Sequence, residues 1–213
     1  MRYNSTSKPT NTAKRVEEKR RHTFLIPLIA IAVVVALIVG LFFLIPELTE
    51  DEYARERAEK VPPEGYTRYS SDVLNMSFVL SNSARQLTLQ SYDLAYYDNG
   101  YYFYVNAMSY QELEEATYNN MADPWRTDVE GYSRDFIIKN NMRDDQRVYN
   151  KDEDIAVITS TYIGDGEAYY DHYVIMDNGE AIFLINFNCP ADKEEAYKDI
   201  FDMLDDYIYV KKY

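Results

Sequence analysis

The sequence predicts an α+β protein, in which an antiparallel sheet is covered by helices and is preceded by one transmembrane helix. Three observations predict this class. Residues 24–45 form a run of 22 residues without a charge. Further on, segments of alternating apolar and polar residues are joined by Asn-Gly turns, which are typical of antiparallel hairpins. The chain then closes on an amphipathic helix that can cover one face of such a sheet.

The run at residues 24–45 is long enough to cross a membrane. As a helix it rises roughly 33 Å, against a hydrocarbon core about 30 Å thick. Seven Lys and Arg residues and only two acids precede it, whereas the segment after it opens with Glu47, Glu50, Asp51 and Glu52. Basic flanks stay in the cytoplasm. We therefore expect a cytoplasmic tail over residues 1–23 and a single-pass cell-membrane protein with its C-terminal part outside the cytoplasm.

The apolar run is expected to remain as a signal anchor. It is longer than the apolar stretch of a signal peptide, and no small-x-small cleavage site follows it. Residues 46–65 are expected to form a charged helix and a linker that ends at Pro62-Pro63, and the lack of an apolar stripe indicates a spacer. Residues 66–213 then make one extracytoplasmic α+β domain.

Composition excludes several classes of partner and site. The chain has 36 acids against 22 Lys and Arg, a net charge of −14, and the part after residue 23 holds 34 of the acids but only 15 of the bases. The exported part therefore repels nucleic acid, and no nucleic-acid partner is predicted. Cys189 is the single cysteine, so no intramolecular disulfide can form, which suits a bacterial envelope.

The secondary structure of the domain follows from its turns and periodicities. Hairpin turns are predicted at residues 98–100 and 177–179, with weaker ones at 164–166 and 151–154. Helices are expected over residues 109–121, opened by a capping box of Ser109 and Glu112, and over residues 133–142. The last helix starts near Asp192. Its apolar face carries Ala196, Tyr197, Ile200, Phe201, Leu204 and Ile208, and the side expected to face solvent carries Glu194, Glu195, Asp199, Asp202, Asp205 and Asp206.

Both ends of the domain resemble the PsbP-like family. The resemblance rests on Tyr69-Ser70-Ser71 with the run from Leu74 to Leu80, and on the run from Asp177 to Phe187 with Ile200-Phe201 and Leu204 after it. The sequence departs from the family at Ser81-Asn82-Ser83, where a proline and then an aromatic residue are common. The resemblance implies an antiparallel sheet between helices and an accessory or binding module. It implies no catalytic residues, and none is carried over.

No motif for catalysis, a cofactor or a metal is present, so the sequence predicts that the protein is not an enzyme. His172 is the one histidine after residue 23 and lies in the middle of a predicted strand, where a packed histidine is the common case and no His-based metal site is expected. Cys189 is interpreted as a buried thiol. Calcium stays an alternative, because three acidic groups could supply oxygen ligands: Asp152–Asp154, Asp165 with Glu167, and Asp202 with Asp205 and Asp206. None of them has the spacing of a calcium loop.

The 22 tyrosines are the most suggestive feature for function. Tyr102 and Tyr104 share one face of a predicted strand whose other face carries Phe103 and Val105. That tyrosine face is either a packing surface for helices or a groove. We hypothesise a non-enzymatic interaction or accessory domain that binds another envelope protein, with Tyr102, Tyr104 and Tyr170 as candidate contacts. The alternative is a receptor for a small ligand or a divalent cation, in a pocket between sheet and helix.

Overall fold

The computed structural model of the chain describes residues 55–120, 125–143 and 146–212. The predicted tail, the predicted transmembrane helix and residues 46–54 lie outside the described residues. Within the described ranges, no helix combines the length and the apolar character needed to span a membrane. The residues from 52 onward form a compact unit by themselves.

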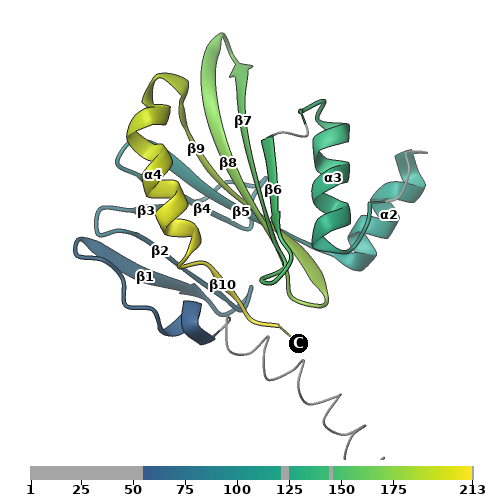
Figure 1. Ribbon diagram of the computed structural model, residues 1–213, viewed down its shortest axis with the longest axis horizontal. Helices are drawn as coiled ribbons and strands as arrows, with labels where there is room; N and C mark the ends of the chain where they lie inside the picture. The colour runs from purple at the N-terminus through teal and green to yellow at the C-terminus, as the bar shows by residue number, and fades with distance from the viewer. Residues whose placement is uncertain (1–54, 121–124, 144–145, 213) are drawn as a thin grey trace, which may run out of the picture. The chain divides into compact units, whose positions relative to one another are not determined.

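The described elements form an α+β fold with two antiparallel sheets (Figure 1). A three-stranded sheet has the order β1-β2-β10, and a seven-stranded sheet has the order β3-β4-β5-β9-β8-β7-β6. The helices are α2 (Tyr110–Asn120), α3 (Val129–Lys139) and α4 (Glu194–Asp205), with a 3-10 turn (Ala191–Lys193) before α4. The strands are β1 (Tyr66–Ser71), β2 (Met76–Ser81), β3 (Arg85–Leu87), β4 (Leu94–Asp98), β5 (Tyr101–Ser109), β6 (Arg147–Asn150), β7 (Ile155–Gly164), β8 (Glu167–Asp177), β9 (Ala181–Pro190) and β10 (Tyr209–Val210).

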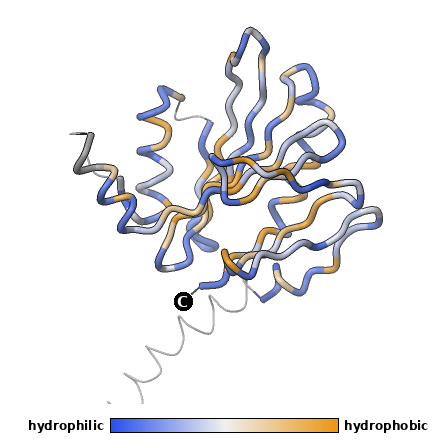
Figure 2. The backbone as a smooth tube through the Cα atoms, turned by 180° about the vertical axis from the view of Figure 1, so that it is seen from behind, coloured by the Kyte–Doolittle hydropathy of each residue, from blue (hydrophilic) through white to orange (hydrophobic). Residues whose placement is uncertain are grey.

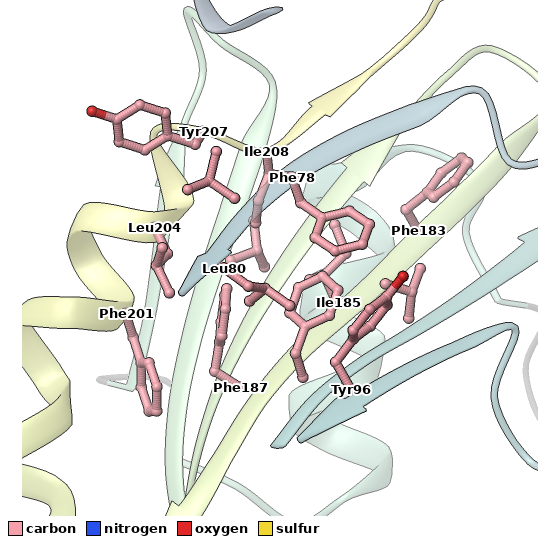
Figure 3. Packing of buried hydrophobic residues seen from close by; sticks show 14 of the residues in the cluster. Phe78, Leu80, Tyr96, Phe183, Ile185, Phe187, Phe201, Leu204, Tyr207 and Ile208 are labelled. Atoms are coloured by element: carbon pink, nitrogen blue, oxygen red, sulfur yellow. The ribbon is translucent and has the colours of Figure 1, made fainter. Parts of the chain in front are cut away.

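Both faces of the seven-stranded sheet are covered over part of their area. One face packs with α4 and the three-stranded sheet, in an aromatic core around Phe78, Phe187 and Phe201 (Figure 3). Phe103 belongs to the same core. The other face packs with α2 and α3 in a smaller cluster that contains Ile182 of β9. The apolar parts of the chain accordingly gather where the strands cross in the middle of the domain (Figure 2). The antiparallel sheet covered by helices is therefore confirmed for the described residues.

The predicted hairpin turns are confirmed. Asn99 and Gly100 have φ values of 47° and 100°, the left-handed region that Asn-Gly sequences favour. A Cβ atom on Gly100 would lie 2.8 Å from the hydroxyl oxygen of Tyr197 on α4. That hydroxyl donates a hydrogen bond to the carbonyl oxygen of Asn99. The β4–β5 turn is therefore determined both by its Asn-Gly sequence and by its contact with Tyr197 of α4.

Two helix starts show how caps decide boundaries. The Ser109–Glu112 capping box is present: the Glu112 carboxylate accepts from the Ser109 N–H at 2.8 Å, and the Ser109 hydroxyl accepts from the Glu112 N–H at 3.2 Å. The next helix starts four residues earlier than the predicted Ser133, because Asp128 caps it by accepting from the Gly131 N–H at 2.7 Å.

The charged segment that ends before β1 is not a free spacer. Residues 55–59 are helical. Arg57 donates to the main-chain oxygen of Asp205 at 2.6 Å and pairs with Glu153. Arg68 in turn donates to the main-chain oxygens of Arg57 and Lys60, at 3.1 and 2.8 Å. These contacts hold the segment against the domain although it has no apolar stripe, because long basic side chains reach main-chain and carboxylate oxygens.

Candidate functional site

The face of the large sheet that carries α2 and α3 changes character along its strands. Under the helices it is apolar, as Ile158, Ile175 and Ile182 show. Beyond the end of α3 it presents two rows of polar and aromatic side chains, because strand pairing sets them side by side. The first row, across β5, β9, β8 and β7, is Tyr102, Asn188, Asp171 and Ser160. The second row, across β5, β9 and β8, is Tyr104, Asn186 and Tyr173.

These rows form the floor of a recess of about 540 Å³, which we call the tyrosine groove. The chain that follows α3 forms its opposite wall, where Asn141 has a φ of 52° and the backbone turns away from the helix axis. The groove is lined by Tyr92, Tyr104, Tyr162, Tyr173, Asp171, Asn186, Asn188, Ser160 and Thr161 on the sheet side, and by Asn140, Asn141, Met142, Arg143 and Gln146 on the other.

Asp171 is the central polar group of the groove. It is 3% exposed, and its carboxylate is fully engaged on the sheet side. One oxygen accepts from the amides of Asn186 and Asn188, at 3.0 and 2.8 Å, and the other accepts from the Tyr173 hydroxyl at 2.8 Å. The side-chain oxygen of Asn186 is buried and has no hydrogen-bond partner. The floor therefore offers acceptor oxygens to a group that can donate.

The aromatic rings stand around this floor in stacked pairs. The rings of Tyr92 and Tyr104 stack at 4.3 Å between centroids, and Tyr102 stacks on Tyr104 at 5.7 Å. At the β7–β8 side, Tyr162 stacks on Tyr169 at 5.6 Å. Tyr92 and Tyr162 are 36% and 44% exposed, so they form the accessible rim. The rings support one another by stacking, which favours a preformed site.

The pKa values of Tyr104 and Tyr173 are raised, so these hydroxyl groups keep their protons at neutral pH. Burial raises the pKa of Tyr104, and the neighbouring tyrosines and Asp171 raise it further. Burial and then the charge of Asp171 likewise raise the pKa of Tyr173. Among the described residues that line the groove there is no histidine, cysteine or lysine. The arrangement can accept, donate and stack, but it brings together no nucleophile with a base.

The structure brings together two of the three tyrosines that the sequence singled out. Tyr104 lines the groove, and Tyr102 lies in the adjacent row. The prediction for Tyr170 is wrong: it is 3% exposed and stacks on Phe201 of α4, at 6.4 Å. Successive residues of a strand point to opposite faces, so Tyr170 points into the aromatic core while Asp171 points into the groove.

Sequence reasoning missed Asp171, Asn186 and Asn188. A signal for them existed. The turn at residues 177–179 sets the register of β8 on β9 and places Asp171 opposite Asn188. The alternation of Tyr169, Asp171 and Tyr173 also predicts one shared face.

A second group of polar side chains lies at the opposite face of β8. His172 is fully buried, and its Nε2 atom is 2.7 Å from Oδ2 of Asp205 in the last turn of α4. Its Nδ1 atom is 3.8 Å from Oδ1 of Asp202. Ligand atoms of the three residues all lie within 4.8 Å of one another, which is close enough to hold a metal ion. We call these three residues the His172 cluster.

The His172 cluster corrects the prediction for Asp205. Asp205 was expected on the solvent side of the last helix, but its side chain is 15% exposed and turns toward β8. Burial raises the pKa of this carboxyl group, and the hydrogen bond from His172 opposes that rise. His172 is a packed histidine in a strand, as the sequence predicted, and it lies close to Asp202 and Asp205. Asp206, which the sequence grouped with these acids, pairs with Lys60 instead, at 2.7 Å.

Three of the five other acids considered for calcium are engaged elsewhere. Glu153 pairs with Arg57, Asp154 accepts from the Tyr149 hydroxyl at 2.9 Å, and Glu167 accepts from the Tyr169 hydroxyl at 3.1 Å. Within the described ranges, the His172 cluster is the one set of three such side chains placed closely enough for a metal. Cys189 is buried, as interpreted from the sequence, and burial raises the pKa of its thiol to about 11.

No family model and no curated protein matches the chain. Similar solved structures include the cyanobacterial PsbP protein CyanoP of Synechocystis sp. PCC 6803, at 14% identity and a TM-score of 0.39, over 71% of this chain and 95% of that one. The Ran-binding protein Mog1p of Saccharomyces cerevisiae is similar at 7% identity and a TM-score of 0.46, over 69% and 96%. LpqN of Mycobacterium tuberculosis, which is involved in cell envelope biogenesis, is similar at 9% identity and a TM-score of 0.35, over 68% and 91%. Likenesses of this degree concern the course of the chain only, so the function is argued from the site.

Proposed function

We propose that this protein is a non-enzymatic binding module that residues 24–45 anchor in the cell membrane, with its α+β domain on the extracytoplasmic side. Its binding site is the tyrosine groove, and its partner is another envelope protein. The observation that carries the proposal is the recess of about 540 Å³ in which stacked tyrosines surround the buried carboxylate of Asp171.

The chemistry of the groove favours a basic side chain of the partner. The floor supplies the negative charge of the Asp171 carboxylate and the unpartnered oxygen of Asn186, which can accept a hydrogen bond from an ammonium or guanidinium group. The tyrosine rings add cation–π attraction of about 0.5–2 kcal/mol. The net charge of −14 also attracts a basic surface over longer distances.

Crosslinking in intact cells tests this proposal with an internal control. A photoreactive residue is placed at Tyr162, on the groove rim, or at Ile163, the next residue of β7, which is 79% exposed and does not line the groove. We expect a discrete adduct with an envelope protein from position 162 and none from position 163. Equal adducts from both positions, or none from position 162, would contradict the proposal.

A second variant ties the adduct to the aromatic rim. Tyr92→Ala removes a rim ring that stacks on Tyr104, whereas Leu89→Ala removes a side chain that is 41% exposed and lies outside the groove. With the photoreactive residue at position 162, Tyr92→Ala is expected to weaken the adduct at least about fivefold, as loss of about 1 kcal/mol of contact implies. Leu89→Ala is expected to leave it unchanged.

A receptor for a small ligand is the second candidate, because the volume of the groove lies within the roughly 300–1,000 Å³ typical of small-molecule sites. Polyamines and cell-wall fragments are suitable probes, since they carry ammonium or hydroxyl donors. A ligand at 100 times its dissociation constant stabilises the folded state by about 2.7 kcal/mol, which raises the melting midpoint by roughly 5–10 °C. A rise that Tyr92→Ala abolishes would favour this candidate over a protein partner.

A further inference from the structure

We propose that the His172 cluster binds one divalent first-row transition metal ion, with Zn²⁺ as the typical case. The ligands are Nδ1 of His172 and the carboxylate of Asp202, Asp205 holds the imidazole from its other nitrogen, and water completes the coordination. This site is on the opposite face of β8 from the tyrosine groove and is independent of the proposed function.

Two buried atoms of the cluster have no hydrogen-bond partner, Nδ1 of His172 and Oδ1 of Asp205. An unpaired polar atom costs free energy when it is buried, so most such atoms in native proteins are satisfied. No described donor reaches either atom. A cation bound at Nδ1 would satisfy the imidazole, and Asp202 faces the same atom from the exposed side of α4, with 58% of its side chain accessible.

The hydrogen bond to Asp205 determines which imidazole nitrogen of His172 is free to bind a metal. The carboxylate can only accept, so the Nε2 atom that it contacts at 2.7 Å carries the proton in the neutral ring. The lone pair is then on Nδ1, the atom that faces Asp202. A carboxylate that holds the far nitrogen of a metal-binding histidine is a recurrent arrangement, because it orients the ring and strengthens it as a ligand.

The separation of the ligand atoms fits one metal ion after a small movement. Two ligands at about 2.1 Å from a tetrahedral zinc lie roughly 3.4 Å apart. Nδ1 of His172 and Oδ1 of Asp202 are 3.8 Å apart. The exposed Asp202 side chain can close the remaining few tenths of an ångström by rotation, while the buried histidine stays fixed.

Solvent can reach the cluster, and the local charge is favourable. Asp202, Asp205 and Asp206 line a cavity of about 350 Å³ that is shared with Glu153 and Arg57. Arg57 is the cation that would compete with a metal, but it is paired with Glu153 and bonds the main-chain oxygen of Asp205 rather than its carboxylate. The carboxylates of Asp202 and Asp205 are left to balance a divalent ion.

The donor set selects the class of metal. One imidazole nitrogen and one carboxylate as ligands, with a second carboxylate bonded to the far side of the ring, suit zinc and its neighbours in the first transition row. Calcium takes six to eight oxygen ligands and rarely an imidazole, and Mg²⁺ also prefers oxygen and keeps its water. The cluster therefore differs from the calcium site that the sequence left as an alternative.

Zinc titration of the full chain tests the site. The chain is purified in detergent without a histidine tag, stripped of metal, and titrated with Zn²⁺ alone against a chromophoric chelator. Asp202→Asn removes one ligand at an exposed position, so folding is preserved. Asp199→Asn makes the same charge change one turn earlier on the exposed side of α4, outside the cluster.

We expect one Zn²⁺ per chain in the wild type and in Asp199→Asn, and an affinity at least about tenfold weaker in Asp202→Asn, since even loss of an outer-shell partner costs 10–100-fold. His172→Gln is expected to abolish the site, with circular dichroism as the check on folding. Equal zinc affinity in Asp202→Asn and the wild type would overturn the proposal, as would the absence of stoichiometric zinc binding. Displacement of Zn²⁺ by an equal concentration of Ca²⁺ would overturn the choice of metal class.

Discussion

Replacing Asp98 by alanine tests whether one buried carboxylate joins the two sheets. Asp98 is fully buried at the end of β4 and accepts four hydrogen bonds. One oxygen accepts from the Ser81 N–H at 2.8 Å and from the Tyr101 hydroxyl at 2.7 Å. The other accepts from the hydroxyl groups of Ser81 and Ser83. Ser81 ends β2 of the small sheet, whereas Tyr101 begins β5 of the large one.

The cost of Asp98→Ala follows from the donors that it leaves unpaired. The Tyr101 hydroxyl and the Ser81 N–H lose their acceptor away from water, at about 1–3 kcal/mol each. The hydroxyl groups of Ser81 and Ser83 lie nearer the surface and can turn to water instead. The free energy of unfolding therefore falls by about 2–6 kcal/mol, which lowers the melting midpoint by at least about 4 °C for a chain of this size.

A double-mutant cycle with Tyr101→Phe separates this hydrogen bond from the other effects of the substitution. In the wild type, Tyr101→Phe costs about 1.5–3 kcal/mol, because it removes a bond to a charged acceptor. In the Asp98→Ala background it costs nothing, since the hydroxyl is already unpaired. The coupling energy is thus at least about 1 kcal/mol. The assay is guanidinium unfolding of the full chain in detergent, followed by circular dichroism, with the exposed substitution Asp199→Asn as the control. Effects that add to within about 0.5 kcal/mol would refute this account of Asp98.

Three further predictions concern single positions. Ser109→Ala lowers the free energy of unfolding by about 0.5–2 kcal/mol at pH 7. Hydrogen bonds from Ser109 lower the pKa of Glu112 from its ordinary 4.5, so this loss of stability shrinks as the pH falls through the folded-state pKa. Unfolding measured at pH 7 and at pH 3 should show the difference. The Cys189 thiol, with a pKa of about 11, should react with a maleimide only when the chain unfolds; rapid labelling of the native protein would count against its burial. Gly100→Ala should destabilise more than Gly166→Ala in thermal melts, because both glycines have positive φ but only the first new Cβ meets another atom, a tyrosine oxygen at 2.8 Å. Equal melting points for the two alanine variants would remove that contact from the explanation.

Local patterns predicted the local structure well. The turns at Asn99-Gly100 and Asn178-Gly179, and the box of Ser109 with Glu112, depend on residues next to one another, so their physics is present in the sequence itself. The start of α3 was misplaced although its cap, Asp128, is equally local. The predicted start was based on the apolar periodicity from Ser133 onward and did not take the N-cap Asp128 into account.

The two candidate sites were predicted poorly because distant segments make them. The groove exists where Tyr104, Asn186 and Asp171 of three strands come into register, and where the chain after α3 stands opposite them. Asp205 was misassigned for a related reason. Helical periodicity predicts on which side of α4 Asp205 lies. It does not predict that this side meets a buried histidine of β8 instead of solvent. Tyr170 shows the same limit, since its face could be assigned only when the packing position of α4 was known.

The end of α3 has a consequence for how the groove can vary. Same-face residues of a strand are spaced by about 6.7 Å, and one helical turn adds about 5.4 Å. Lengthening α3 by one turn beyond Lys139 would therefore roof over about one row of groove side chains, and shortening it by a turn would uncover a row that is now apolar. The aromatic core on the other face would not change. Helix length at this one point thus sets the size and polarity of the recess, so its specificity can be altered by insertion or deletion while the scaffold that holds it stays the same.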